Sequence, residues 1–183
     1  MIMGALLLGL FAVPCQAGTD EFTPRSDGFI RDWLLLAPIQ LAADADGAEA
    51  IEKNQIPDEG LLKPKAGDKV TVRGKELTWK KAKATDYFLD LNAICNAETE
   101  KAMAYAVAYV RAEEERKNLR LKMGSNDQGA VYLNGKLLLK TTDGRTLDQD
   151  SDIARDVTLN KGINVVVFKV FNEGGSDWQG CLR

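Results

Sequence analysis

The sequence of 183 residues contains no histidine. Histidine is the most common general base in enzymes and a common ligand of zinc and iron. Its absence excludes Ser–His–Asp and Cys–His nucleophile systems built from this chain alone. Two carboxylates can still hydrolyse a glycosidic bond, but nothing in the order of the residues places such a pair on facing strand ends. We therefore expect a protein with no catalytic residue and no cofactor, and a carboxylate glycoside hydrolase is the weaker alternative.

The sequence also lacks an excess of positive charge. Lys and Arg number 24 against 27 Asp and Glu, and a chain with a net charge of −3 has no electrostatic reason to bind nucleic acid or anionic lipid. The apolar run at residues 2–13 is shorter than the roughly 20 residues that a membrane-spanning helix needs. Together with Cys15-Gln16-Ala17 it predicts a signal peptide over residues 1–17, although no Lys or Arg precedes it. We expect no nucleic-acid partner, no membrane span, and export to the periplasm, the cell surface or the extracellular space.

Cysteine is scarce, with three in the sequence. Cys95 and Cys181 remain after the predicted cleavage, and two cysteines are too few to define a disulfide framework. In an oxidising compartment they can pair, which would close a long loop and stabilise the fold by a few kcal/mol through the unfolded chain. The alternative is two buried free thiols, and the geometry of the fold decides between them.

Short runs of alternating or β-branched residues, separated by turn residues, make up most of the sequence. Residues 18–28 form a polar lead, residues 41–56 predict a short helical or loop insertion, and the domain extends over residues 29–183. Asn134-Gly135 separates two apolar runs and predicts a hairpin, because both residues accept the positive φ of a type I′ turn. Strands this closely spaced indicate an antiparallel sandwich or barrel. The expected strands are residues 29–36, 69–72, 77–80, 87–91, 102–111, 119–123, 130–133, 136–140, 153–159, 163–170 and 177–182.

Several of these runs resemble one known group. Residues 31–38, RDWLLLAP, resemble the "W, apolar, apolar, Gly-Pro-Phe" opening of galactose-binding-like domains in bacterial secreted proteins, which are similar to the sugar-binding N-terminal domain of family 2 glycoside hydrolases. Residues 104–106 resemble that group's AYA strand, residues 124–136 its "GSDDG, V, W, LNGK" hairpin, and residues 159–164 the turn before its long strand. The sequence departs from the group at Ala37-Pro38-Ile39, in the residue 126–129 loop and at Tyr132. The resemblance implies an all-β, antiparallel, jelly-roll sandwich, a fold that hosts sugar binders, protein binders and inert spacers.

The resemblance also decides which secondary structure we expect for residues 97–118. Helix propensity alone favours a helix there, since Ala, Glu, Lys and Met dominate the segment. Met103, Tyr105 and Val107 nevertheless stand at a spacing of two with Ala between them, as in a strand buried on both faces. We therefore expect a strand from about Ala102 to Arg111.

Tryptophan is the residue type best suited to stack on a sugar ring. Trp33 lies within an apolar strand and belongs to the core. Trp79 ends a hairpin strand among lysines, and Trp178 follows Gly-Gly-Ser-Asp, so both are candidates for an exposed ligand platform, with burial in the core as the alternative. Asp177 and Asn126 are the polar candidates beside them, and for Asn126 the alternative is to fasten its own turn.

Asp148, Asp150 and Asp152 alternate as ligands do in the first half of a calcium loop. The rest of that motif is missing, since Ile153 stands where glycine is needed and Leu159 where a bidentate Glu is needed. Structural calcium is one interpretation of the three carboxylates, and a solvated acidic loop is the other.

The sequence thus supports an exported, non-catalytic carbohydrate-binding or accessory module whose partner is a glycan or another cell-surface component. The alternative is a structural or protein-interaction domain of the cell surface without a small ligand. An exposed Trp79 or Trp178 beside a polar concavity favours the first hypothesis, whereas three buried tryptophans favour the second.

Overall fold

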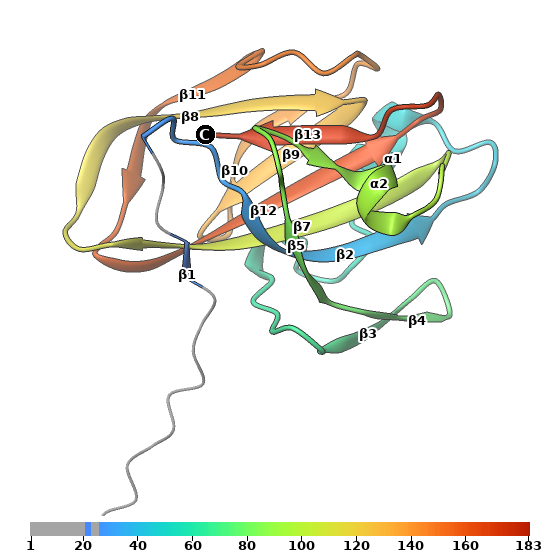
Figure 1. Ribbon diagram of the computed structural model, residues 1–183, viewed down its shortest axis with the longest axis horizontal. Coiled ribbons are helices and arrows are strands. Elements are labelled where there is room, and N and C mark those ends of the chain that lie inside the picture. The colour runs from blue at the N-terminus through green and yellow to red at the C-terminus, as the bar shows by residue number, and fades with distance from the viewer. Residues whose placement is uncertain (1–20, 23–25) are drawn as a thin grey trace, which may run out of the picture.

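The computed structural model describes residues 21–22 and 26–183, and these form an all-β, antiparallel sandwich. The predicted signal peptide, residues 1–17, lies outside the described residues. Figure 1 shows two layers of strands with their loops gathered at the two ends. None of the helices in residues 26–183 is long and apolar enough to cross a membrane.

The larger sheet contains seven strands. In spatial order these are β10 (Lys136–Thr141), β9 (Gln128–Leu133), β12 (Gly162–Asn172), β7 (Ala102–Ala112), β2 (Asp32–Gln40) and β5 (Lys80–Lys83), with β1 (Glu21–Phe22) parallel to β7. The smaller sheet consists of β11 (Asp152–Leu159), β8 (Arg116–Asn126), β13 (Gln179–Leu182) and β6 (Leu89–Asp90). A separate hairpin is formed by β3 (Lys69–Val72) and β4 (Lys75–Thr78).

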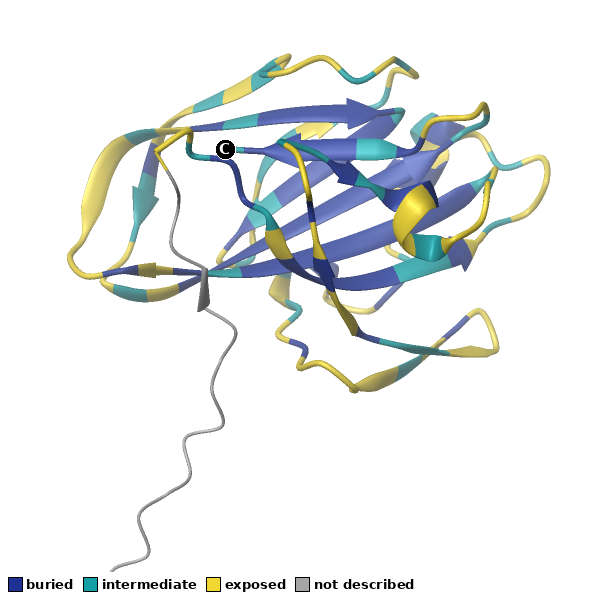
Figure 2. Ribbon diagram, in the orientation of Figure 1, coloured by how far each residue is buried: buried dark blue, intermediate teal, exposed yellow. Residues whose placement is uncertain are grey.

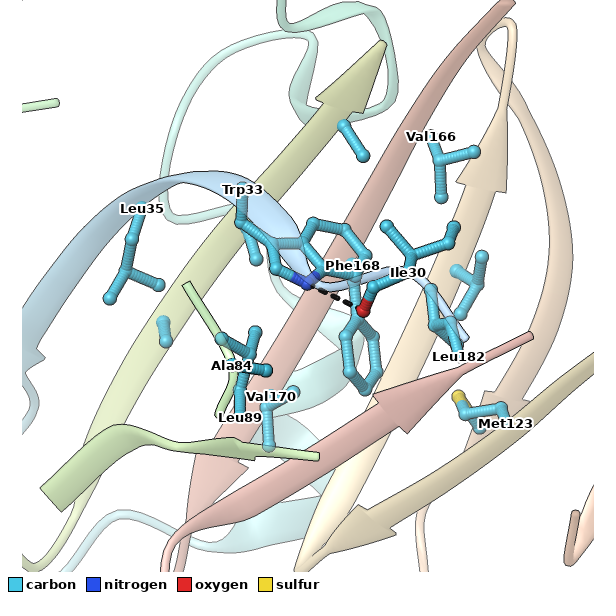
Figure 3. Packing of buried hydrophobic residues seen from close by; sticks show 14 of the residues in the cluster. Ile30, Trp33, Leu35, Ala84, Leu89, Met123, Val166, Phe168, Val170 and Leu182 are labelled. Atoms are coloured by element: carbon cyan, nitrogen blue, oxygen red, sulfur yellow. Dashed lines mark hydrogen bonds between the residues drawn. The ribbon is translucent and has the colours of Figure 1, made fainter. Parts of the chain in front are cut away.

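The main core lies between the two sheets. Trp33 and Phe168 approach with ring centroids 6.2 Å apart, and the Trp33 indole donates a hydrogen bond to the carbonyl of Ile30 at 3.1 Å (Figure 3). Leu182 and Trp178 close the core from the β13 side, and both are fully buried. Burial of aromatic and aliphatic surface of this kind is the main force that holds the two sheets together.

The outer face of the larger sheet is buried as well. On β7, Met103, Tyr105 and Val107 belong to a second apolar cluster, while the alanines between them face the main core. Residues 41–80 cover the second cluster with α1 (Gly47–Glu52), the short 3-10 helix η1 (Glu59–Leu61) and the β3–β4 hairpin. Figure 2 shows β7 and β12 as almost continuously buried strands. The expected two-faced burial of the strand at residues 102–111 is therefore confirmed.

Local signals set several of these elements. The expected hairpin turn is confirmed, because Asn134 and Gly135 have φ of 51° and 88°. The helix expected within residues 41–56 is α1, whose first turn is capped by the Asp46 carboxylate accepting from the Glu49 amide at 2.9 Å. The strand expected over residues 87–91 is wrong beyond Leu89–Asp90. There the Asp90 side chain accepts a hydrogen bond from the Ala93 amide and starts α2 (Leu91–Cys95).

Candidate functional site

Polar side chains converge at one end of the sandwich, where the turn from β8 to β9, the end of β12 and the residue 142–151 loop meet. This is the end that carries α1 and α2 in Figure 1. We call the group the rim cluster; it comprises Ser125, Asp127, Gln128, Arg145 and Glu173.

Glu173 is the centre of the rim cluster. Its carboxylate accepts a hydrogen bond from Gln128 Nε2 at 2.8 Å and one from the Gly47 amide at 3.4 Å, and it lies 3.6 Å from the Lys101 ammonium. A Cβ at Gly47 would lie 2.2 Å from Gln128 Nε2, so a larger residue there would displace the Gln128 side chain from its present position. The start of α1 therefore closes over the Gln128–Glu173 pair.

Asp127 ties the β8–β9 turn to the end of β12. Its Oδ2 accepts from the Glu173 amide at 2.8 Å, and its own amide donates to the carbonyl of Phe171 at 3.0 Å. The Ser125 hydroxyl donates to the Asp127 carbonyl at 2.9 Å and accepts from Arg145 Nη2 at 3.0 Å. These bonds fix the turn and bring Arg145 from the residue 142–151 loop into the rim cluster.

Two polar atoms of this cluster lack a protein partner in the described part of the chain. Gln128 is 1% exposed, yet its Oε1 accepts no hydrogen bond, and Arg145 Nε donates none. The same holds for Oδ1 of Asn172, the residue that precedes Glu173. Buried polar atoms are nearly always hydrogen-bonded, so each exception calls for an explanation. An unpaired acceptor and an unpaired donor in one cluster suit a ligand with several hydroxyl groups, since each hydroxyl both donates and accepts.

The two tryptophans predicted as ligand platforms are both buried. Trp79 is 4% exposed and packs in the second apolar cluster, and Trp178 is fully buried in the main core. The expectation of an exposed stacking face is therefore wrong at both positions. At Trp79 the neighbouring lysines are exposed while the ring itself packs in the second apolar cluster. Trp33 is buried as expected.

The polar candidates Asn126 and Asp177 lie at the same end of the sandwich as the rim cluster. Asn126 ends β8 opposite Gln179 of β13, and Asp177 stands two residues before Gln179 in the β12–β13 loop. Asn126 is 8% exposed, whereas Asp177 is exposed. The fold thus brings these two residues together, and Trp79 lies elsewhere, on the outer face of the larger sheet.

The three aspartates of the residue 148–152 segment form no calcium site. No group of three metal-ligating side chains occurs among the residues that the structure describes. Asp150 pairs with Lys122 at 2.8 Å and with Arg183, and these cations, Arg183 first, lower the pKa of its carboxyl. Asp152 pairs with Arg145, and Asp148 is exposed. The calcium interpretation is wrong because the alternation sends the carboxylates to different partners.

Cys95 and Cys181 are free thiols. Cys181 is buried, and this burial raises the pKa of its thiol to about 11. Cys95 ends α2, is partly exposed, and has a pKa that burial also raises. The alternative of unpaired thiols therefore holds, and the disulfide does not form in this structure.

A buried ion pair lies under residues 41–65, on the outer face of the larger sheet. Lys169 is fully buried and Glu59 is 2% exposed, and the ammonium lies 3.1 Å from the carboxylate. Lys169 also donates to the carbonyls of Ile51 at 3.0 Å and Lys53 at 2.7 Å. Burial lowers the pKa of Lys169, and Glu59 opposes that shift. The hydroxyls of Tyr105 and Tyr132 donate to the same carboxylate.

Sequence reasoning missed Gln128, Arg145 and Glu173. Gln128 lies in the loop that departs from the resembled hairpin, and nothing in the sequence analysis singled out Glu173. No local pattern joins residues 45 positions apart. Lys169 did carry a signal, since it is the one charge in the run Val165 to Phe171.

No family model and no curated protein matches the chain. Solved structures similar to it are chains of glycoside hydrolases. A β-glucuronidase from Ruminococcus gnavus in complex with D-glucaro 1,5-lactone is 16% identical with a TM-score of 0.44, over 83% of this chain and 23% of that one. The β-glucuronidase of the same organism in complex with uronic deoxynojirimycin is 14% identical with a TM-score of 0.41, over 88% and 30%. A β-glucosidase from Kluyveromyces marxianus is 14% identical with a TM-score of 0.40, over 57% and 14%. This chain therefore spans less than a third of the length of each of these enzymes.

Proposed function

We propose that this chain is an exported, non-catalytic carbohydrate-binding or accessory module whose ligand contacts the rim cluster. The observation that carries the proposal is the unpaired Gln128 Oε1 and Arg145 Nε beside two carboxylates at the loop end of the sandwich. Both atoms are buried in this structure, so the proposal requires the rim cluster to open enough for ligand hydroxyls to donate to Gln128 Oε1 and to accept from Arg145 Nε. Hydrogen bonds that involve a charged group each contribute about 1.5–3 kcal/mol, so a few of them give modest affinity.

A non-catalytic role is supported by how the rim carboxylates are engaged. Asp127 accepts the backbone amide of Glu173, and Glu173 accepts Gln128 and the Gly47 amide, so both hold the loops in place. Two-carboxylate hydrolysis needs one carboxyl to donate a proton to the leaving group and the other to act as a base or nucleophile. In our proposal both side chains position loops and ligand and neither transfers a proton.

The experiment is a glycan-array screen of residues 18–183, followed by titration of any bound glycan against Arg145→Gln and Glu173→Gln. We expect each variant to bind roughly 10- to 100-fold more weakly, from the loss of one charge-assisted hydrogen bond. Asp143→Asn is the matched control, since it lies exposed in the same loop outside the rim cluster. Equal binding by all three variants, or turnover of an aryl glycoside that the Glu173 variant abolishes, contradicts the proposal.

A structural or protein-interaction domain of the cell surface is the second candidate. The burial of all three tryptophans favours it, because none of the three presents its ring to the solvent for stacking on a sugar. A folded protein that binds no glycan on the array but is captured by one surface component of its host would support this candidate.

A further inference from the structure

A strongly basic surface lies apart from the rim cluster. Residues 63–83 carry eight basic and two acidic side chains, a net +6, so the remaining residues must carry −9 to give the chain its −3. All eight cations are exposed, and Figure 2 shows the β3–β4 hairpin largely in the colour of exposed residues. We call this surface the basic strip; its cations are Lys63, Lys65, Lys69, Arg73, Lys75, Lys80, Lys81 and Lys83.

Most of this charge is not neutralised within the protein. Lys69 pairs with Glu76 at 2.7 Å, and Lys83 pairs with Asp32 at 3.4 Å. Five of the cations have no carboxylate partner among the described residues, namely Lys63, Lys65, Arg73, Lys75 and Lys80. Lysines on an edge strand such as β5 also prevent unwanted strand pairing. That role does not explain the cations at the hairpin turn and in the connector before it.

A cavity opens beside the strip where β5 pairs with β2. It has a volume of about 400 Å³ and is lined by the charged residues Asp32, Lys81 and Lys83 together with apolar residues such as Leu34 and Val107. Sites for small ligands typically measure about 300–1,000 Å³ and combine apolar walls with a few polar groups. Asp32 pairs with Lys83 at the cavity wall, and the charged residues of the lining still sum to +1. A compact ring that carries a carboxylate matches this net positive charge and the apolar wall.

We infer that the basic strip binds an acidic polysaccharide, a polymer of sugar-acid units, with one unit in the cavity and its neighbours along the hairpin. A repeating polyanion matches a row of exposed cations, and the net −9 of the remaining residues repels it from the rest of the surface. This inference rests on the proposed carbohydrate role and specifies the class of ligand. It concerns a surface separate from the rim cluster, so the two can fail independently.

Polygalacturonate is the test probe, measured by affinity electrophoresis and by titration calorimetry against residues 18–183. The test variant combines Arg73→Asn, Lys75→Gln and Lys80→Gln. Asparagine suits the turn at position 73, where φ is 51°. The control variant makes the same charge change at three exposed cations outside the strip, Arg120→Gln, Lys136→Gln and Lys161→Gln.

We expect the wild-type protein to bind polygalacturonate with an affinity that falls as salt rises. The test variant should bind roughly 3- to 100-fold more weakly, from three exposed charge contacts of ordinary strength. The control variant should bind as the wild type does, and both variants should keep the wild-type Tm.

Equal binding by the two variants overturns the inference. Equal binding of the fully methyl-esterified polymer, or of duplex DNA at matched charge concentration, also overturns it, because a sugar-acid site must distinguish both. Loss of array binding in the Glu173 variant with polygalacturonate binding retained would separate this site from the rim cluster.

Discussion

Replacement of Lys169 by methionine should destabilise the protein far more than the same change at a surface ion pair. Methionine fills much of the volume of lysine but leaves Glu59 buried without its cation, and it leaves the carbonyls of Ile51 and Lys53 without a donor. Removal of one partner from a buried pair costs about 3–5 kcal/mol. For a chain of this size 1 kcal/mol corresponds to about 2–4 °C, so Tm should fall by roughly 6–20 °C.

The control for this prediction is Lys140→Met. Lys140 pairs with Glu52, whose side chain is 54% exposed, and such a surface pair contributes at most about 1 kcal/mol. Urea unfolding followed by circular dichroism measures both variants, the single variant Glu59→Gln and the double variant Lys169→Met/Glu59→Gln. The double variant should lose less stability than the two single changes combined, because its remaining partner is no longer charged. A Lys169→Met loss equal to that of Lys140→Met would refute the reasoning.

Three further predictions concern thiols, calcium and alkaline pH. Cys181 should resist Ellman's reagent at pH 8 in the folded protein and react, with Cys95, after unfolding in guanidinium; a Tm that falls on addition of reductant would indicate a disulfide instead. Millimolar calcium or a chelator should leave Tm unchanged, because Asp150 already pairs with two cations, and a calcium-dependent rise in Tm would contradict this. Burial raises the pKa of Tyr109 from 10.0 to about 12, so the stability that its neutral form contributes is complete below pH 10 and is lost as the pH rises toward 12. The free energy of unfolding should therefore fall less steeply over that range in Tyr109→Phe than in the wild type, and parallel curves would show that the tyrosine contributes nothing.

The fold could be predicted where the signal was local. Asn134-Gly135 requires only its own two backbone angles, so the hairpin follows from the dipeptide. Along β7 the alternation of large residues and alanine indicated burial on both faces, although helix propensity competed with it and the family resemblance decided for a strand. The structure places the alanines against the main core and Met103 and Tyr105 against the outer cluster. These features depend on the spacing of apolar side chains along a strand and on the conformational preferences of turn residues, and both can be recognised within a short stretch of sequence.

The candidate site could not be predicted in the same way. Trp79 stands among lysines. Adjacent side chains of a strand point to opposite faces, so exposed lysines beside Trp79 do not indicate that its ring is exposed too. Gln128 and Glu173 meet through the pairing of β9 with β12, a contact between distant segments. The cations of residues 63–83 were visible in the sequence, yet a net charge of −3 for the whole chain concealed their concentration on one surface.

The covering of the outer sheet face by residues 41–80 has a consequence for any attempt to shorten this protein. That segment looks like an insertion between two strands, and deleting an insertion is a common way to obtain a minimal domain. Here the deletion would expose the apolar face of β7 and β12 together with the Lys169 ammonium, which now rests against carbonyls of the segment itself. A truncated chain should therefore aggregate rather than fold as a smaller sandwich. The boundary of the folding unit includes the insertion, and protein engineering should vary the hairpin surface and leave the backbone that covers the sheet intact.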